Sequence, residues 1–247
     1  MAILYLLDAL IGWLVGVAIN HAADLLPRRQ SLRQWPVCPA CARQRAYPAW
    51  SALLAALTGQ QNCPHCQQPR PRLIRSMIVE SATPLIFIFM LWQQGLSVQL
   101  VLLSIYTAVL ILITVTDLEH RLIFNGVVLP SILFGLGAAF LNPEPSWLSA
   151  LIGGVSAFIL SYLAALVARG GLGGGDVTLS TFLGVIIGFP YVLLSLTLGV
   201  FLGGFVAFLL LMTRRVGLKT FIPYGPFLTT TGWIMLIWGS EIWAYYF

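Results

Sequence analysis

The chain has 247 residues, of which 59% are hydrophobic and 9% charged, and its 13 basic and 8 acidic residues give a formal net charge of +5. Soluble domains carry about 25% charged residues, so the composition excludes an ordinary water-soluble fold. The apolar runs are continuous and do not alternate in ten-residue segments, which excludes a membrane β-barrel and predicts an all-α polytopic membrane protein.

Eight apolar runs follow one another along the chain, separated by short polar or Gly/Pro-bearing connections. A helix of about 17–25 apolar residues can cross a bilayer. The first run lacks a basic leading segment and a small-residue cleavage site, so we expect a retained helix rather than a secretory signal. We expect about eight transmembrane helices, at 3–26, 77–93, 98–116, 123–141, 147–168, 177–190, 192–212 and 226–245.

The chain is expected to have three parts: a first transmembrane helix at 1–26, a polar loop at 27–76 between helices one and two, and a membrane bundle at 77–247. Within the bundle, the division between the sixth and seventh helices rests on Gly188, Phe189 and Pro190, which interrupt the apolar sequence there.

The basic residues lie in the connections after helices one, three, five and seven, on one side of the predicted membrane. They are Arg28, Arg29, Arg33, Arg43, Arg45, Arg70, Arg72, Arg75, Arg121, Arg169, Arg214, Arg215 and Lys219. Because Lys and Arg gather in cytoplasmic loops, the loop at 27–76 should face the cytoplasm and both termini should face outward. The basic pI near 9.3 is therefore explained by topology, and we expect no nucleic-acid partner.

Four cysteines form two CxxC pairs within the polar loop: Cys38, Cys41, Cys63 and Cys66. Two such pairs can place four thiolates around one structural Zn²⁺ ion, which leaves no coordination position for a substrate. The alternatives are two disulfides or four free thiols, and a reducing cytoplasm disfavours the disulfides. His65, inside the second pair, is expected to be a bystander.

Acidic residues are rare near the predicted spans, and each is a functional candidate because burying a charge in a membrane costs about 2.5–3.5 kcal/mol. Asp117 ends the third helix, and Asp176 follows the glycine-rich segment 170–175 at the start of the sixth. The topology puts both at the same membrane face. Two nearby carboxyl groups do not both ionise easily, so one keeps a proton while the other activates water, as in aspartic peptidases.

Either aspartate alone is weaker evidence. Asp117 alone could pair with Arg121 one turn later, and the glycines before Asp176 could be a simple helix stop. The sequence does not say which carboxylate is the base.

Several segments together resemble the bacterial prepilin peptidases, which are intramembrane aspartic proteases of the Gly-x-Gly-Asp type. They are the Asp117 segment, Gly173–Asp176, the cysteine loop, Gly16–Asn20 with Leu26 and Pro27, Glu80, and Pro223–Phe227. The resemblance covers nearly the whole chain. It departs from the usual family pattern at Val17, Leu25, Phe124 and Thr178, and none of these changes removes a carboxylate or a thiolate.

The resemblance implies cleavage of the leader from type IV pilin precursors or type II secretion pseudopilins, on the cytoplasmic side of the bacterial inner (plasma) membrane and after a glycine. It assigns Asp117 and Asp176 as catalytic and the four cysteines as metal ligands. Members with the cysteine loop often also methylate the new amino terminus, which requires S-adenosylmethionine. Because Leu25 departs from the family pattern, the resemblance supports the peptidase more strongly than the methyltransferase.

Three rival functions are weighed against this one. An ion-coupled transporter would carry charges near the centres of its spans, whereas the acids here cluster at span ends. A presenilin-like protease would carry a Pro-Ala-Leu motif that the last helix lacks. A non-catalytic zinc-knuckle scaffold would tolerate the loss of either aspartate.

Overall fold

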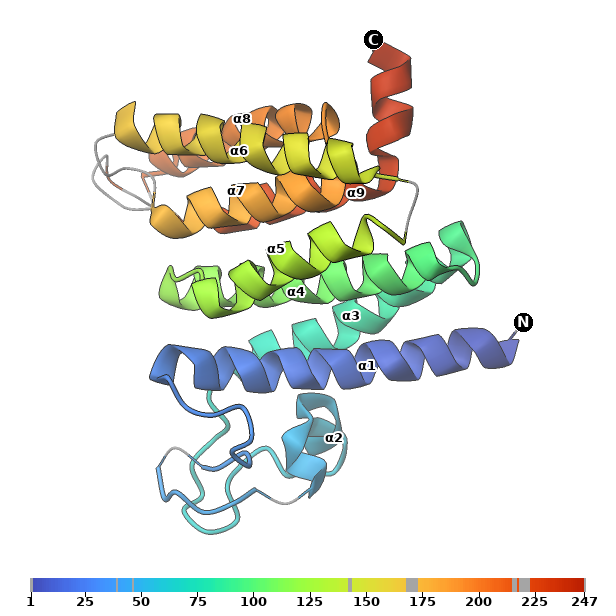
Figure 1. Ribbon diagram of the computed structural model, residues 1–247. Coiled ribbons are helices and arrows are strands. Elements are labelled where there is room, and N and C mark those ends of the chain that lie inside the picture. Colours follow the sequence, from blue (N-terminus) through green and yellow to red (C-terminus); the bar gives the residue numbers. More distant parts are fainter. Residues whose placement is uncertain are drawn as a thin grey trace. The chain divides into compact units, whose positions relative to one another are not determined.

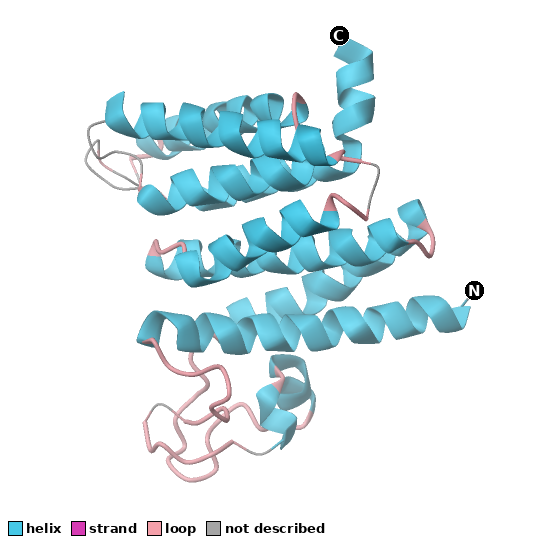
Figure 2. Ribbon diagram, in the orientation of Figure 1, coloured by secondary structure: helices cyan, strands magenta, loops and turns pink. Residues whose placement is uncertain are grey.

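A computed structural model describes residues 2–38, 40–45, 47–141, 144–167, 173–214, 217 and 223–246. Arg169, Arg215, Lys219, Gly170 and Gly171, which the sequence placed at the inner membrane face, lie outside the described residues. The described chain is helical (Figure 2). Two isolated β-bridges lie in its cysteine loop. The all-α class expected from the composition is confirmed.

The apolar helices of the structure match the predicted spans closely, with one short additional helix, α2, inside the polar loop (Figure 1). The α-helices are α1 Ala2–Leu25, α2 Ala52–Leu57, α3 Leu73–Gln94, α4 Val98–His120, α5 Asn125–Ala138, α6 Trp147–Val167, α7 Gly174–Ile187, α8 Tyr191–Met212 and α9 Gly225–Tyr246. Two 3₁₀ turns, η1 Leu26–Arg28 and η2 Tyr47–Trp50, lie in the polar loop.

The predicted break between the sixth and seventh spans is confirmed at Gly188. This residue follows α7 with a φ of +80°, a conformation that side chains other than hydrogen disfavour. Its N–H still donates to the carbonyl of Gly184, which ends the helix before α8 begins.

Within the described residues, five helices are long and apolar enough to cross a membrane: α1, α3, α4, α6 and α8. Two others, α5 and α7, have 14 residues each. At 1.5 Å per residue they reach about 21 Å, less than the roughly 30 Å of a bilayer core. The helix set establishes a multi-pass membrane protein.

The chain divides into two compact units, at 1–104 and 105–247. In the first unit, α1 and α3 pack antiparallel through small residues of α1. A Cβ atom added to Gly12 would lie 2.7 Å from Cα of Pro84, and one added to Gly16 would lie 3.1 Å from Cα of Glu80. Such small residues let two membrane helices approach closely enough for their backbones to touch.

The core of the second unit is α7, which is buried on nearly every side. Leu179, Phe182 and Leu183 have no exposed surface. Its closest neighbour is α6, where a Cβ atom on Gly153 would lie 2.3 Å from the carbonyl oxygen of Gly184. A helix that is apolar on every face is buried on every face. Because the neighbouring helices enclose α7, the position of its first residues is fixed.

A second helix pair of this unit, α4 with α9, is joined by polar contacts. The hydroxyls of Thr114 and Thr229 share a hydrogen bond of 2.7 Å, and the Trp233 indole N–H donates to the Thr107 hydroxyl at 3.1 Å. The order of these contacts makes the two helices antiparallel, so the end of α4 lies beside the start of α9.

Candidate active site and metal centre

Asp117 lies in the last turn of α4 and is 5% exposed. Its Oδ2 accepts a hydrogen bond of 2.9 Å from the backbone N–H of Gly225, the first residue of α9. The first N–H groups of a helix have no partner inside the helix and carry a partial positive charge. The start of α9 therefore stabilises a carboxylate on Asp117, which the C-terminal end of α4 alone would disfavour.

Asp176 lies in the first turn of α7 and is 9% exposed. Its Oδ2 accepts a hydrogen bond of 3.0 Å from the N–H of Gly173, the residue before the helix. This is the side-chain half of a helix capping box, and it fixes the carboxylate at the helix start. A glycine N–H thus orients each of the two aspartates.

Two contacts hold the start of α7 against the turn between α4 and α5. A Cβ atom on Gly175 would lie 2.8 Å from Cβ of Ile123, so the backbone of Gly175 packs directly against the Ile123 side chain. The hydroxyl of Thr178 donates to Oδ1 of Asn125 at 3.0 Å. Thr178, one of the departures from the family pattern, therefore ties the start of α7 to the start of α5.

The carboxyl groups of Asp117 and Asp176 lie close enough for the charge of one to act on the other. Tyr224 is the neighbour of Gly225 and lies outside the helix. Burial and the nearby charge of Asp176 raise the pKa of Tyr224 to about 12. Residues 224 and 225 thus link the two aspartates, a contact that the sequence could suggest only through the resemblance of Pro223–Phe227 to a family motif.

Two buried carboxyl groups, one at a helix end and one at a helix start, can divide the roles of proton donor and proton acceptor. Such a pair can position a water molecule between them and stabilise an oxyanion. The described residues at this place supply carboxylates and backbone amides rather than the thiolates or imidazoles that zinc prefers.

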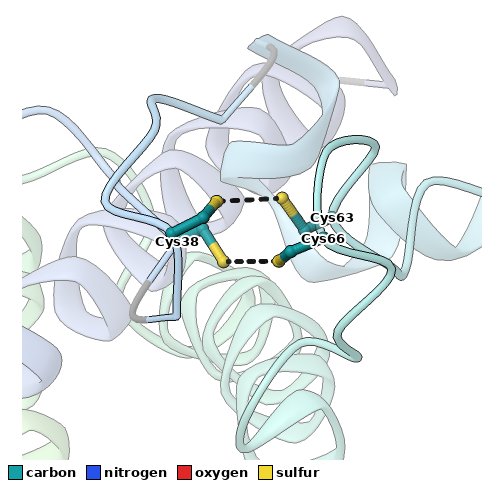
Figure 3. A group of neighbouring side chains, drawn as sticks. Cys38, Cys63 and Cys66 are labelled. Atoms are coloured by element: carbon teal, nitrogen blue, oxygen red, sulfur yellow. Dashed lines mark hydrogen bonds between the residues drawn. The ribbon is translucent and has the colours of Figure 1, made fainter.

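The four cysteines of the first unit come together as one cluster, with all Sγ atoms within 4.8 Å of one another (Figure 3). Sγ of Cys38 lies 3.6 Å from Sγ of Cys66, and Sγ of Cys41 lies 3.7 Å from Sγ of Cys63. These distances exceed a disulfide bond of about 2.05 Å. They match the separation of about 3.8 Å between sulfurs in a tetrahedron with Zn–S bonds of about 2.3 Å.

The two CxxC turns are structural copies, with corresponding positions 25 residues apart. The N–H of Cys38 donates to the Arg43 carbonyl, as that of Cys63 donates to the Gln68 carbonyl, both at 2.9 Å. Ala42 and Gln67, each directly after the second cysteine of its pair, have φ values of +55° and +57°. The repeat is visible in the sequence as two short segments with the pattern Cys-Pro-x-Cys, each followed four residues later by an arginine.

The environment of the thiols favours a bound cation. Backbone N–H groups of Cys41 and Ala40 lower the pKa of Cys38, and those of His65 and Cys66 lower the pKa of Cys63 to about 6. The backbone N–H of Gln68 lowers the pKa of Cys66. Burial and the neighbouring thiols outweigh this effect and raise that pKa to about 12. Four thiolates this close would repel one another without a positive ion between them, and this donor set fits zinc.

His65 lies outside the cluster, and its Nδ1 shares a hydrogen bond of 3.1 Å with the Arg43 guanidinium. Four sulfurs already fill a tetrahedron, so His65 is not needed as a ligand.

Glu80 on α3 has 0% exposure and accepts four hydrogen bonds. The N–H groups of Ala52 and Leu53 donate to it at 2.8 and 3.0 Å, the Ser51 hydroxyl at 2.5 Å and the Asn20 amide at 3.1 Å. The carboxyl group thereby caps the first turn of α2 and ties it to α1 and α3. The sequence marked Glu80 as a family match without revealing this role, because its partners lie 27–60 positions away.

Asp24, at the end of α1, makes ion pairs. Its Oδ1 lies 2.6 Å from Arg75 and 3.6 Å from Arg72. These ion pairs account for an acidic residue at the end of α1, so no catalytic role is needed to explain Asp24.

Residues 104–208 match the family model described as the type IV leader peptidase family, a segment that contains both aspartates. The chain is similar to the prepilin leader peptidase/N-methyltransferase of Pseudomonas putida, with 32% identity over 79% of this chain and 70% of that protein. Proteins with the same name from Pseudomonas aeruginosa and Bacillus subtilis are 27% and 22% identical, over 94% and 100% of this chain and 90% and 97% of their own lengths.

No solved structure matches the chain. The similarity to curated relatives extends beyond the segment of the family model, through the cysteine loop at one end and the last helix at the other. On the match of residues 104–208 and on the identity to these relatives, the chain belongs to the type IV leader peptidase family.

Proposed function

We propose that the chain cleaves the basic leader from type IV pilin or type II secretion pseudopilin precursors, with Asp117 and Asp176 as its catalytic pair. The observation that carries this proposal is the pair of buried carboxyl groups, each bound by a glycine N–H and close enough to interact electrostatically. Both belong to the segment that matches the family.

The pair performs general acid–base catalysis. The ionised carboxylate removes a proton from water while the water oxygen attacks the carbonyl carbon of the scissile bond. The protonated carboxyl group donates a hydrogen bond to the oxygen that becomes negatively charged. Collapse of the tetrahedral intermediate breaks the C–N bond, and the proton taken from water goes to the leaving amine. Either aspartate can take either role in this scheme.

The substrate is a precursor with a basic leader followed by an apolar helix lying in the bilayer. Two acidic side chains at the membrane face attract such a leader, and the helix presents the scissile bond from within the membrane. In this proposal the enzyme lies in the bacterial inner membrane with its cysteine loop and active site toward the cytoplasm, an orientation supported by the basic residues gathered in the corresponding connections.

The zinc-binding loop is proposed to be structural. Cys38, Cys41, Cys63 and Cys66 hold Zn²⁺ in a closed site, so the ion folds the loop and takes no part in hydrolysis. Functionally, the chain divides into the helix at 1–26, this loop at 27–76 and the peptidase bundle at 77–247.

Methylation of the new amino terminus is the second candidate function. The observation in its favour is that the relatives named above are peptidases and N-methyltransferases by name, and the similarity includes the cysteine loop. S-adenosylmethionine would supply the methyl group. The cavity of about 600 Å³ between α1 and the loop is lined by five arginines, whose charge disfavours the cationic sulfonium group of this cofactor.

Incubation of a pilin precursor with membranes that contain the chain tests the proposal. The product should be shortened by the leader, and sequencing of its amino terminus should place the cut directly after a glycine. A matched precursor with a bulky residue in place of that glycine should stay intact. A precursor that persists unchanged in both forms contradicts the proposal and favours a scaffold.

A further inference from the structure

The first unit contains a cavity of about 600 Å³ between α1 and the polar loop. Its α1 wall extends from Leu14 to Leu25, which is about 16 Å of helix at 1.5 Å per residue. The opposite wall is formed by loop residues that include Trp35 and Trp50. The volume lies in the range of cavities that bind small molecules.

The loop end of the cavity is strongly basic. Five arginines line it, and the one acidic residue in the lining, Asp24, is already paired with Arg72 and Arg75. The lining arginines are Arg28, Arg33, Arg45, Arg70 and Arg72. A cavity with this excess of positive charge selects an anion.

Arg45 and Arg70 occupy equivalent positions in the two cysteine turns. The N–H of Arg45 donates to the Pro36 carbonyl and that of Arg70 to the Gln61 carbonyl, both at 3.0 Å. Burial and the charge of Arg45 lower the pKa of Arg70. The repeated turn thus brings two like charges toward one cavity, and an anion between them would relieve their repulsion.

The other end of the cavity is apolar and belongs to a membrane helix. Leu14, Val17 and Ala18 line it, and α1 is one of the five helices long and apolar enough to span a membrane. Leu14 is 53% exposed. Trp35 and Trp50 pack with ring centroids 5.0 Å apart, and tryptophan is typical of the zone where a membrane meets water.

We propose that this cavity binds one anionic phospholipid, with the headgroup phosphate at the arginines and an acyl chain along Leu14, Val17 and Ala18. Arginine forms strong charge-assisted hydrogen bonds with phosphate, and basic pockets beside membrane helices bind anionic headgroups. A free anion would leave the apolar end unfilled, and a cationic cofactor would be repelled from the basic end. The lipid fastens the cysteine loop to the membrane surface.

Native mass spectrometry of the full chain from nanodiscs tests this proposal without any cleavage assay. The wild type should retain one phosphatidylglycerol and should not retain phosphatidylcholine. The double variant Arg28→Gln/Arg33→Gln removes two exposed lining charges. We expect it to bind the lipid about 25-fold more weakly, since each arginine near an anionic lipid contributes about a fivefold factor. The charge-matched control Arg29→Gln/Arg214→Gln, outside the cavity lining, should stay within about twofold of wild type.

A second variant, Ala18→Trp, fills the apolar end and leaves every charge in place. It should also weaken lipid retention, whereas a site for free phosphate would be unaffected. Zinc content and thermal unfolding confirm that each variant is folded. Equal retention by both double variants, displacement of the lipid by inorganic phosphate, or saturable competition by S-adenosylmethionine would overturn the proposal.

Discussion

The backbone N–H of Gly225 donates a 2.9 Å hydrogen bond to Oδ2 of Asp117, which lies 108 positions earlier in the chain. Gly225 begins α9, and Pro226 after it has no N–H of its own. Proline in the first turn of a helix is common, because the N–H it lacks would have no partner within the helix. The first N–H of α9 is therefore directed at the carboxylate, and Asp117 depends on a helix from the far end of the chain.

Replacement of Gly225 by alanine should abolish most of the peptidase activity. An added Cβ atom would lie 2.6 Å from Oδ2 and 3.0 Å from Cγ of Asp117, so the carboxylate must move. A displacement near 1 Å at a catalytic group costs about a hundredfold in rate. Initial rates of precursor cleavage measure the effect.

Gly204→Ala is the matched control, since an added Cβ atom at this α8 position has open space within 4 Å. It should cleave at the wild-type rate. If Gly225→Ala matched it at equal expression, the contact with Asp117 would have no catalytic importance.

Replacement of Glu80 by alanine should destabilise the first unit. The substitution removes the buried carboxylate that accepts four hydrogen bonds. Their donors are the first two N–H groups of α2, the Ser51 hydroxyl and the Asn20 side-chain amide. Unpaired buried donors cost about 3 kcal/mol in the free energy of unfolding. For a chain of this size that lowers Tm by roughly 6–12 °C.

Glu241→Ala, an exposed position in α9, provides the comparison for the Glu80 variant. The measurement is the Tm of thermal unfolding of both purified variants in the same detergent. A Tm for Glu80→Ala equal to that of the control would show that α2 does not need its carboxylate cap.

Removal of zinc should unfold the cysteine loop while leaving the peptidase bundle helical. Purified wild type is expected to hold one zinc ion per chain, and Cys38→Ser should hold far less. The loop of the variant should then be cut quickly by trypsin, whose target arginines are abundant there. Precursor hydrolysis should fall less than loop protection, because a four-sulfur site leaves no position for a substrate.

His65→Ala distinguishes a bystander from a ligand in the same measurement. Since His65 binds Arg43 and lies outside the sulfur cluster, its replacement should preserve both zinc and trypsin resistance. Loss of the metal in this variant would contradict the four-cysteine site.

The sequence predicted the helices well, because each is a nearly continuous apolar run. Its boundaries differ from the structure by at most a few residues, and the break at Gly188 was found from three residues. It did not predict that α5 is only 14 residues long, since apolar residues beyond a helix end look the same as those within it. The expected length of the sixth span was right, but its bounds of 177–190 lie three residues later than those of α7.

The candidate site residues could be named from the sequence, but the contacts that support them could not. Rare acids in an apolar chain and paired CxxC motifs are local signals. The hydrogen bonds of Gly225 to Asp117 and of Ala52 to Glu80 join positions 108 and 28 residues apart, and no periodicity carries that information. The arginines at equivalent positions of the two cysteine turns were present in the sequence, and comparing the two turns would have found them.

The most direct test of the account is cleavage of a pilin precursor by membranes that contain wild type, Asp117→Asn or Asp176→Asn at equal expression. Asparagine keeps the size of the side chain and the oxygen that accepts the glycine N–H, but removes the capacity to exchange a proton. General acid–base catalysis contributes roughly 10²–10⁴ in rate, so both variants should lose at least about a hundredfold. Cleavage near the wild-type rate by either variant would contradict the proposed pair.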